Sequence, residues 1–179
     1  LTYFSREFSP YRLPYYRIAE YARYRSNVQA GVGTIAYSEG SGFQVNLRGW
    51  NDLDYTTLHE LAHQWWGDVY GARMQGRQLL NEGLAQYSTL MAYKEFAPPA
   101  LTRRIVASMH DGYLNARSNE SSAEQPVILT EDQAYISYHK APLALFALQE
   151  LLGAAKVNGA LRSYYARFVD MKPPFPTSR

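Results

Sequence analysis

The stretch YTTLHELAHQWWGD, residues 55–68, decides how this chain is interpreted. It places His59 and His63 four residues apart, and Gly67 follows as a residue that can end a helix in the left-handed conformation. On a helix, two imidazoles at this spacing stand on one face, about 6 Å apart along the axis. We therefore predict a helix whose two histidines can reach one common point.

Two histidines at this spacing, with a glutamate directly after the first, form the pattern of a catalytic zinc site. Glu60 lies about 100° round the helix from His59, where it can take a proton from water without being a metal ligand. Zinc prefers four ligands, and a catalytic site keeps one position open, so a third protein ligand must come from elsewhere. Glu82 is the candidate, because 18 residues separate it from His63 and it stands near the start of the next helical pattern.

The pattern HELAH can also arise by chance on an amphipathic helix, since His and Glu are common on half-exposed faces. A carboxylate at a suitable distance, inside the separate helix-start motif Asn81-Glu82-Gly83-Leu84-Ala85, argues against coincidence. We therefore retain the zinc site with His59, His63 and Glu82 as ligands.

Composition narrows the class of protein further. With 179 residues, 46% hydrophobic and 19% charged, the chain fits one globular domain, which we place at residues 1–179. The formal charge is only +2 and the basic residues are scattered, so we expect no nucleic-acid partner. There is no cysteine, which means that a zinc site must use His and carboxylate ligands.

The hydropathy of the chain and the sequence at its two ends indicate whether it is a membrane protein, a secreted precursor or a soluble fragment. There is no run of about 18 apolar residues, and the first residues lack the basic start and apolar middle of a signal peptide. We expect a soluble piece. The chain does not begin with Met and ends in the Pro-rich segment KPPFPTSR, so we interpret it as a fragment of a longer polypeptide.

The remaining pattern predicts a predominantly α fold with a short β segment before the metal-binding helix. Apolar residues recur at helical spacing or lie in short β-prone runs bracketed by glycine. The expected elements are a helix at 16–24, strands at 34–37 and 43–47, and helices at about 80–97, 99–117, 139–152 and 157–169.

The segment HELAHQWWGD followed by NEGLAQY resembles the gluzincin zinc aminopeptidases, the family of aminopeptidase N, over about residues 30–169. The segments YSEGSGF and ISYHKAPLALFALQELLG look closest to peptidase domains on bacterial ABC-transporter permease-like membrane proteins. The resemblance implies a thermolysin-like zinc peptidase catalytic domain with one Zn²⁺ and a peptide substrate. It further implies a membrane-embedded parent protein with transporter-like segments and a place on the extracytoplasmic face of a bacterial membrane.

The resemblance also assigns two residues that spacing alone does not. Tyr138, in Tyr138-His139-Lys140-Ala141, matches a family tyrosine that hydrogen-bonds the oxyanion of the tetrahedral intermediate, although Ala141 replaces the family glycine. The family's G-x-M-E-N motif, whose Glu binds the substrate α-amine, has no counterpart here. Glu39 stands in a comparable place before the metal helix, either as a substitute amine-binding carboxylate or as a solvated turn residue.

The leading hypothesis is zinc-dependent, aminopeptidase-like hydrolysis of peptide bonds, with Glu60 as general base and Tyr138 stabilising the oxyanion. The alternative is a zinc-containing peptide-binding or regulatory domain of a transporter-like protein without turnover. A structural zinc fits less well, because such sites close the shell with four protein ligands, often cysteines. We expect Trp65 and Trp66 to pack in the core, and Asp68 either to orient a ligand imidazole or to lie at the surface.

Overall fold

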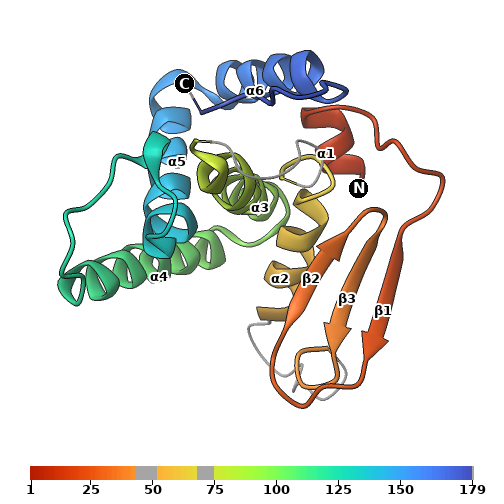
Figure 1. Cartoon of the computed structure of the whole chain (residues 1–179), viewed down its shortest axis with the longest axis horizontal. Helices are drawn as coiled ribbons and strands as arrows, with labels where there is room; N and C mark the ends of the chain where they lie inside the picture. The colour runs from red at the N-terminus through yellow and green to blue at the C-terminus, as the bar shows by residue number, and fades with distance from the viewer. Residues whose placement is uncertain (43–51, 68–74, 179) are drawn as a thin grey trace.

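Helices dominate the part of the chain that the computed structural model describes, residues 1–42, 52–67 and 75–178 (Figure 1). In chain order, the elements are α1 (Thr2–Glu7), β1 (Arg17–Tyr21), β2 (Val28–Gly31), β3 (Thr34–Ser38), α2 (Asp52–Ala62), the π-helical turn η1 (Leu79–Gly83), α3 (Leu84–Phe96), α4 (Pro99–Ser118), the 3-10 turn η2 (Val127–Leu129), the π-helical turn η3 (Ile136–Lys140), α5 (Ala141–Leu152) and α6 (Ala154–Phe168). The predominantly α class with a small β segment before α2 is confirmed.

The three described strands form one sheet in the order β1-β3-β2. β3 pairs in parallel with β1, and antiparallel with β2, so Ile35 stands opposite Ile18 on one side and Ala30 on the other. Ile35 and Tyr37 of this central strand are buried. β2 is left at the edge of the sheet that lies beside α2 (Figure 1).

The sequence interpretation was wrong for residues 16–24, which form no helix: Arg17–Tyr21 is strand β1. Four of its five side chains are exposed, so the segment has no buried face to produce the alternating pattern of a strand. β2 was not predicted at all. The strand expected at 34–37 is confirmed as β3, and the strand expected at 43–47 lies outside the described residues.

The other predicted helices are present, with shifted ends. α2 ends at Ala62, before Gly67, although Gly67 does adopt a positive φ of 100°. The helix expected at 139–152 begins as the π-helical turn η3 and continues as α5, and α6 starts three residues before the expected position 157. In the described part of the chain, we find no helix with the length and apolarity needed to cross a bilayer.

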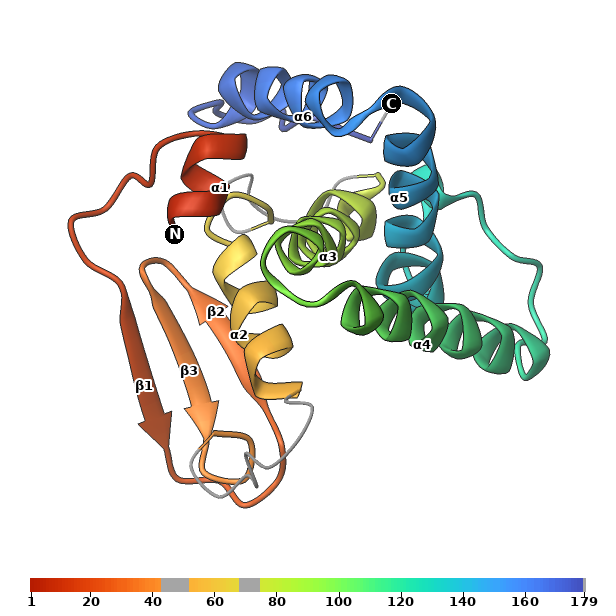
Figure 2. The same ribbon diagram turned by 180° about the vertical axis from the view of Figure 1, so that it is seen from behind.

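Helix α3 passes through the middle of the molecule, between α2 on one side and α4 and α5 on the other (Figure 2). Nine of its thirteen residues are buried. Trp65 and Trp66 after α2 fill the core as expected, with 1% and 0% exposure. The Trp65 indole N–H donates to the Ser9 carbonyl and that of Trp66 to the Ser88 hydroxyl, each at 2.8 Å. The turn after α2 is thereby joined to the segment after α1 and to α3.

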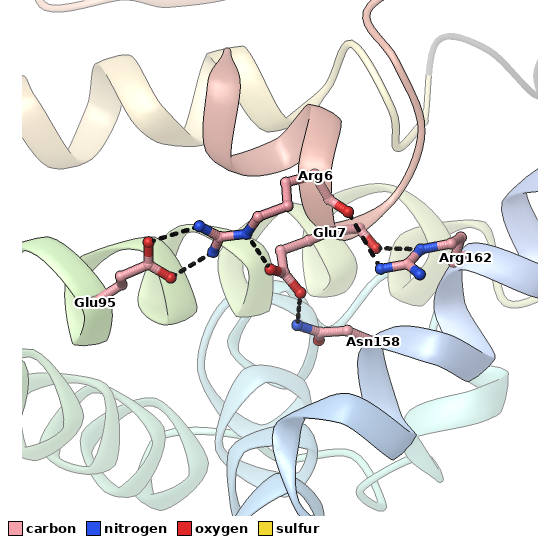
Figure 3. A network of polar contacts seen from close by, with 5 residues as sticks. All are labelled: Arg6, Glu7, Glu95, Asn158 and Arg162. Atoms are coloured by element: carbon pink, nitrogen blue, oxygen red, sulfur yellow. Dashed lines mark hydrogen bonds and ion pairs between the residues drawn. The ribbon is translucent and has the colours of Figure 1, made fainter.

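A polar network fastens α1 to α3 and α6 (Figure 3). Arg6 forms a two-pronged ion pair with Glu95 of α3, and the Asn158 amide of α6 donates to the Glu7 carboxylate at 2.8 Å. The buried Tyr87 hydroxyl donates to the other end of the same Asn158 side chain at 3.0 Å. The two ends of the chain are thereby held against the helix that leads away from Glu82.

Candidate metal centre

Three predicted ligands converge between α2 and the start of α3. The Nε2 atoms of His59 and His63 are 3.1 Å apart, and Glu82 Oε2 lies 3.2 Å from the first and 3.6 Å from the second. Both histidines are 7% exposed. Within the described ranges, these residues form the one group of His, Cys, Asp or Glu side chains arranged to hold a metal ion.

The spacing of the three donor atoms fits zinc. Ligands bound tetrahedrally at about 2.0–2.1 Å lie about 3.3 Å from one another, and the observed separations are 3.1–3.6 Å. Burial raises the pKa of the Glu82 carboxyl, but the adjacent His59 and His63 imidazoles outweigh this and hold that pKa well below its usual range. Glu82 is therefore ionised and ready to bind a cation.

Neighbouring groups fix the orientation of these side chains. His63 Nδ1 lies 3.1 Å from the Trp66 carbonyl, and a proton donated there leaves the Nε2 lone pair facing Glu82. The Asn81 amide donates to Glu82 Oε1 at 3.2 Å, so the other carboxylate oxygen faces the histidines. Asp68, predicted as a candidate to orient a ligand imidazole, lies outside the described residues.

Gly67 is required by the close approach of the chain to Asn81. Its φ of 100° favours glycine, and an added Cβ would overlap the Asn81 side-chain amide. We expect Gly67→Ala to displace Asn81 and to weaken zinc affinity roughly 10–100-fold, as loss of an orienting partner does. A competition titration with a chromogenic chelator measures this. Gly159→Ala in α6 is the control, because nothing lies within 4 Å of its added Cβ; equal affinities in the two variants would contradict this role.

Glu60 and Tyr138 line the same cavity of about 280 Å³ as the three candidate ligands, with β2 along another wall. Glu60 is 8% exposed and is not one of the three converging ligands. Burial raises the pKa of its carboxyl, against the lowering effect of His59, His63 and the backbone amide of Ala30 in β2. The cavity therefore holds a carboxyl with a raised proton affinity beside the metal centre.

Tyr138 reaches this cavity from the turn η3. Its ring centroid lies 6.1 Å from that of His59. Burial and the charge of Glu82 raise the pKa of its phenol, so the hydroxyl stays protonated at neutral pH and can donate a hydrogen bond. Both Tyr138 and Glu82 lie in π-helical turns, which are rare and frequently occur at functional sites.

The sequence matches a known family. Residues 10–172 match the Peptidase family M1 domain. The chain belongs to peptidase family M1. The predicted resemblance to aminopeptidase N-like gluzincins is thus confirmed at the level of the family.

Relatives of this M1 domain are longer proteins. It is 27% identical over 179 residues to Aminopeptidase M1-C of Oryza sativa subsp. japonica, covering 89% of this chain and 19% of that protein. It is 24% identical over 183 residues to Probable aminopeptidase 1 of Sulfurisphaera tokodaii, covering 94% and 23%. The chain therefore spans about a fifth of the length of these curated relatives.

The fold of this M1 domain is also found in solved structures. The M1 zinc metallopeptidase from Deinococcus radiodurans superposes with a TM-score of 0.69 and 24% identity, covering 93% of this chain and 35% of that one. A variant of that enzyme bound to a Tyr-Ser-Ala substrate superposes with a TM-score of 0.67. The mostly helical fold is therefore that of M1 zinc metallopeptidases.

The structure does not bring Glu39 of this M1 domain to the metal cavity. Glu39 follows the end of β3, where its backbone amide donates to the Tyr21 carbonyl at 3.3 Å, and it is absent from the cavity lining. The lining strand is β2, through residues 28–30, together with Asn27 just before it. Sequence analysis missed these residues, and the glycine pair that brackets the β2–β3 turn was the available signal for them.

The two other histidines lie apart from the metal. His110 is exposed on α4. The His139 ring packs on Gly112 of α4 and lines a neighbouring cavity. Neither is part of the group that can hold the metal.

Proposed function

We propose that this M1 domain hydrolyses peptide bonds at one zinc ion held by His59, His63 and Glu82, and that it acts as an aminopeptidase. The observation that carries the proposal is the set of three donor atoms 3.1–3.6 Å apart in a cavity that also contains Glu60 and Tyr138. The family membership and the aminopeptidase descriptions of its relatives support it.

The bound zinc supplies Lewis acidity, which acidifies water and polarises a substrate carbonyl. Glu60 takes the proton of the attacking water and later delivers it to the leaving amine. Its raised pKa suits the first step, because a base with a higher proton affinity takes up the proton more readily. The Tyr138 hydroxyl donates a hydrogen bond to the carbonyl oxygen as negative charge develops on it.

A cleavage assay tests the proposal against binding without turnover. We expect the zinc-loaded chain to release the N-terminal residue from short peptides, and we expect a zinc chelator to stop this and added zinc to restore it. Liquid chromatography of the products measures cleavage, and calorimetry measures peptide binding. Peptides that bind in a zinc-dependent way and stay intact would favour the alternative of a peptide-binding or regulatory domain.

Tyr138→Phe removes one hydroxyl while keeping the ring. We expect kcat to fall about 10²–10³-fold, the effect of losing one oxyanion donor, with KM and zinc content little changed. Steady-state kinetics measures this split. Tyr24→Phe is the control, since Tyr24 is 86% exposed. A Tyr138→Phe enzyme with the parent kcat would refute the oxyanion role.

Several finer expectations also remain proposals. Glu39 is proposed as a substrate-binding residue, although it lies outside the lining of the metal cavity. A thermolysin-like core, a membrane-embedded parent with transporter-like segments, and an extracytoplasmic location likewise rest on the resemblance in the sequence. A structural zinc is disfavoured, because the described residues supply three ligands rather than four.

A further inference from the structure

Two further cavities adjoin the metal cavity in turn. The second cavity, of about 300 Å³, shares Tyr138 with the metal cavity. The third cavity, of about 710 Å³, shares Arg104 with the second. The three cavities therefore form a series in which neighbouring cavities share one lining side chain.

Helix α3 gives the same order for the three cavities. On α3 and the turn before it, Glu82 belongs to the metal cavity, Gln86 to the second and Phe96 to the third. At 1.5 Å per residue, Gln86 and Phe96 lie about 6 Å and 21 Å along the helix from Glu82. On α2, which is packed against α3, His59 lines the metal cavity, Tyr55 the second, and Asp54, Thr57 and Leu58 the third.

Helix α4 provides the opposite wall of this path. It contributes Arg104, Ile105, Ser108 and Met109 to the second cavity, and Ala100, Leu101 and Arg104 to the third. Figure 2 shows α2 and α4 on either side of α3. We call the second and third cavities together the α2–α4 trough.

The chemistry of the trough changes along its length. Near the metal, the second cavity offers polar groups such as Gln86, Ser108 and His139. The third cavity is mainly apolar, with Leu58, Leu101 and Phe96 among its lining residues. Phe96 is 67% exposed there, so its ring offers apolar surface to a bound side chain.

We propose that the α2–α4 trough binds the C-terminal side of an extended peptide substrate and prefers an apolar side chain at its far end. This inference rests on the proposed function. An aminopeptidase leaves one residue before the scissile bond, so a long path from the metal can hold only residues after it. At about 3.3 Å per extended residue, a path of about 21 Å accommodates five to six residues.

The test is a set of peptides with one N-terminal residue and lengths of three to eight, each ending in leucine. We expect kcat/KM to rise roughly tenfold or more between three and six residues and then to level off, since burial of one apolar side chain has about this effect. Ala100→Trp places a bulky group in the third cavity and should abolish the rise while leaving tripeptide cleavage unchanged. Ala107→Trp is the matched control, because Ala107 is exposed on the same helix and lines neither cavity.

Binding to the Glu60→Gln variant separates this proposal from the proposed function. In one outcome, the parent chain cleaves no peptide, but a six-residue peptide binds more tightly than a three-residue peptide and Ala100→Trp removes this difference. That outcome supports peptide binding in the trough and contradicts the peptidase function. If peptides are cleaved and both kcat/KM and Kd are independent of length, the trough is overturned and the function stands. A change of oligomeric state in Ala100→Trp without a change in length dependence would also overturn it, since the trough would then cover another copy of the chain.

Discussion

Glu60→Gln is expected to lower kcat by about 10²–10⁴-fold, the usual contribution of a general acid–base group, while zinc stays bound at one ion per chain. The amide keeps the shape of the carboxylate and its contact with the Ala30 amide, but it cannot take a proton from water. The proposed metal ligands His59, His63 and Glu82 are untouched. Peptide turnover and elemental analysis on the same protein sample measure both quantities.

Glu20→Gln is the matched control, because Glu20 is an exposed residue of β1 away from the metal cavity. It should keep the parent kcat. If Glu60→Gln lost as much zinc as a substitution of a ligand does, Glu60 would be a metal ligand and its assignment as the base would be wrong. Full turnover by Glu60→Gln would remove Glu60 from the chemistry.

Glu82→Ala is expected to weaken zinc binding roughly 10²–10³-fold, because each ligand of a zinc site carries several kcal/mol of the binding free energy. His59 and His63 remain, but the ionised carboxylate that faces both is lost. Chelator competition measures the affinity, and thermal unfolding supplies an independent check. Zinc at 100 times its Kd should stabilise the parent by about 2.7 kcal/mol, and the variant far less.

The control for this substitution is Glu20→Ala, which removes a carboxylate of the same kind from an exposed site. It should bind zinc as tightly as the parent. Unchanged zinc affinity in Glu82→Ala would mean that the third ligand lies elsewhere in the chain.

The convergence of the three candidate ligands could be predicted because they lie in or next to neighbouring helices. His59 and His63 share one helix, where the 3.6-residue period alone places both imidazoles on one face. Glu82 required a second local signal, the start of the following helix, and the structure brings its carboxylate to the two imidazoles. Tyr138 needed the family resemblance, because the chain contains 16 tyrosines and nothing in the composition separates this one.

The β segment was harder to predict because the order of its strands depends on pairing between residues that are far apart in the sequence. β1 is joined in parallel to β3, residues 17–21 with 34–38, and its exposed side chains leave no alternation in the sequence. β2 has only four residues and depends on β3 for its partner. As a result, the sequence alone did not predict that β2 forms the wall of the metal cavity opposite the helices. It also did not predict the α2–α4 trough, because the helices that line the trough are far apart in sequence.

The measurement that tests the metal centre most directly is a crystal structure of the zinc-loaded chain with anomalous diffraction data at the zinc edge. The structure predicts one anomalous peak, at about 2.0–2.2 Å from His59 Nε2, His63 Nε2 and Glu82 Oε2. A peak at other residues, or zinc bound by the two histidines with Glu82 turned away, would contradict the three-ligand site and the chemistry built on it.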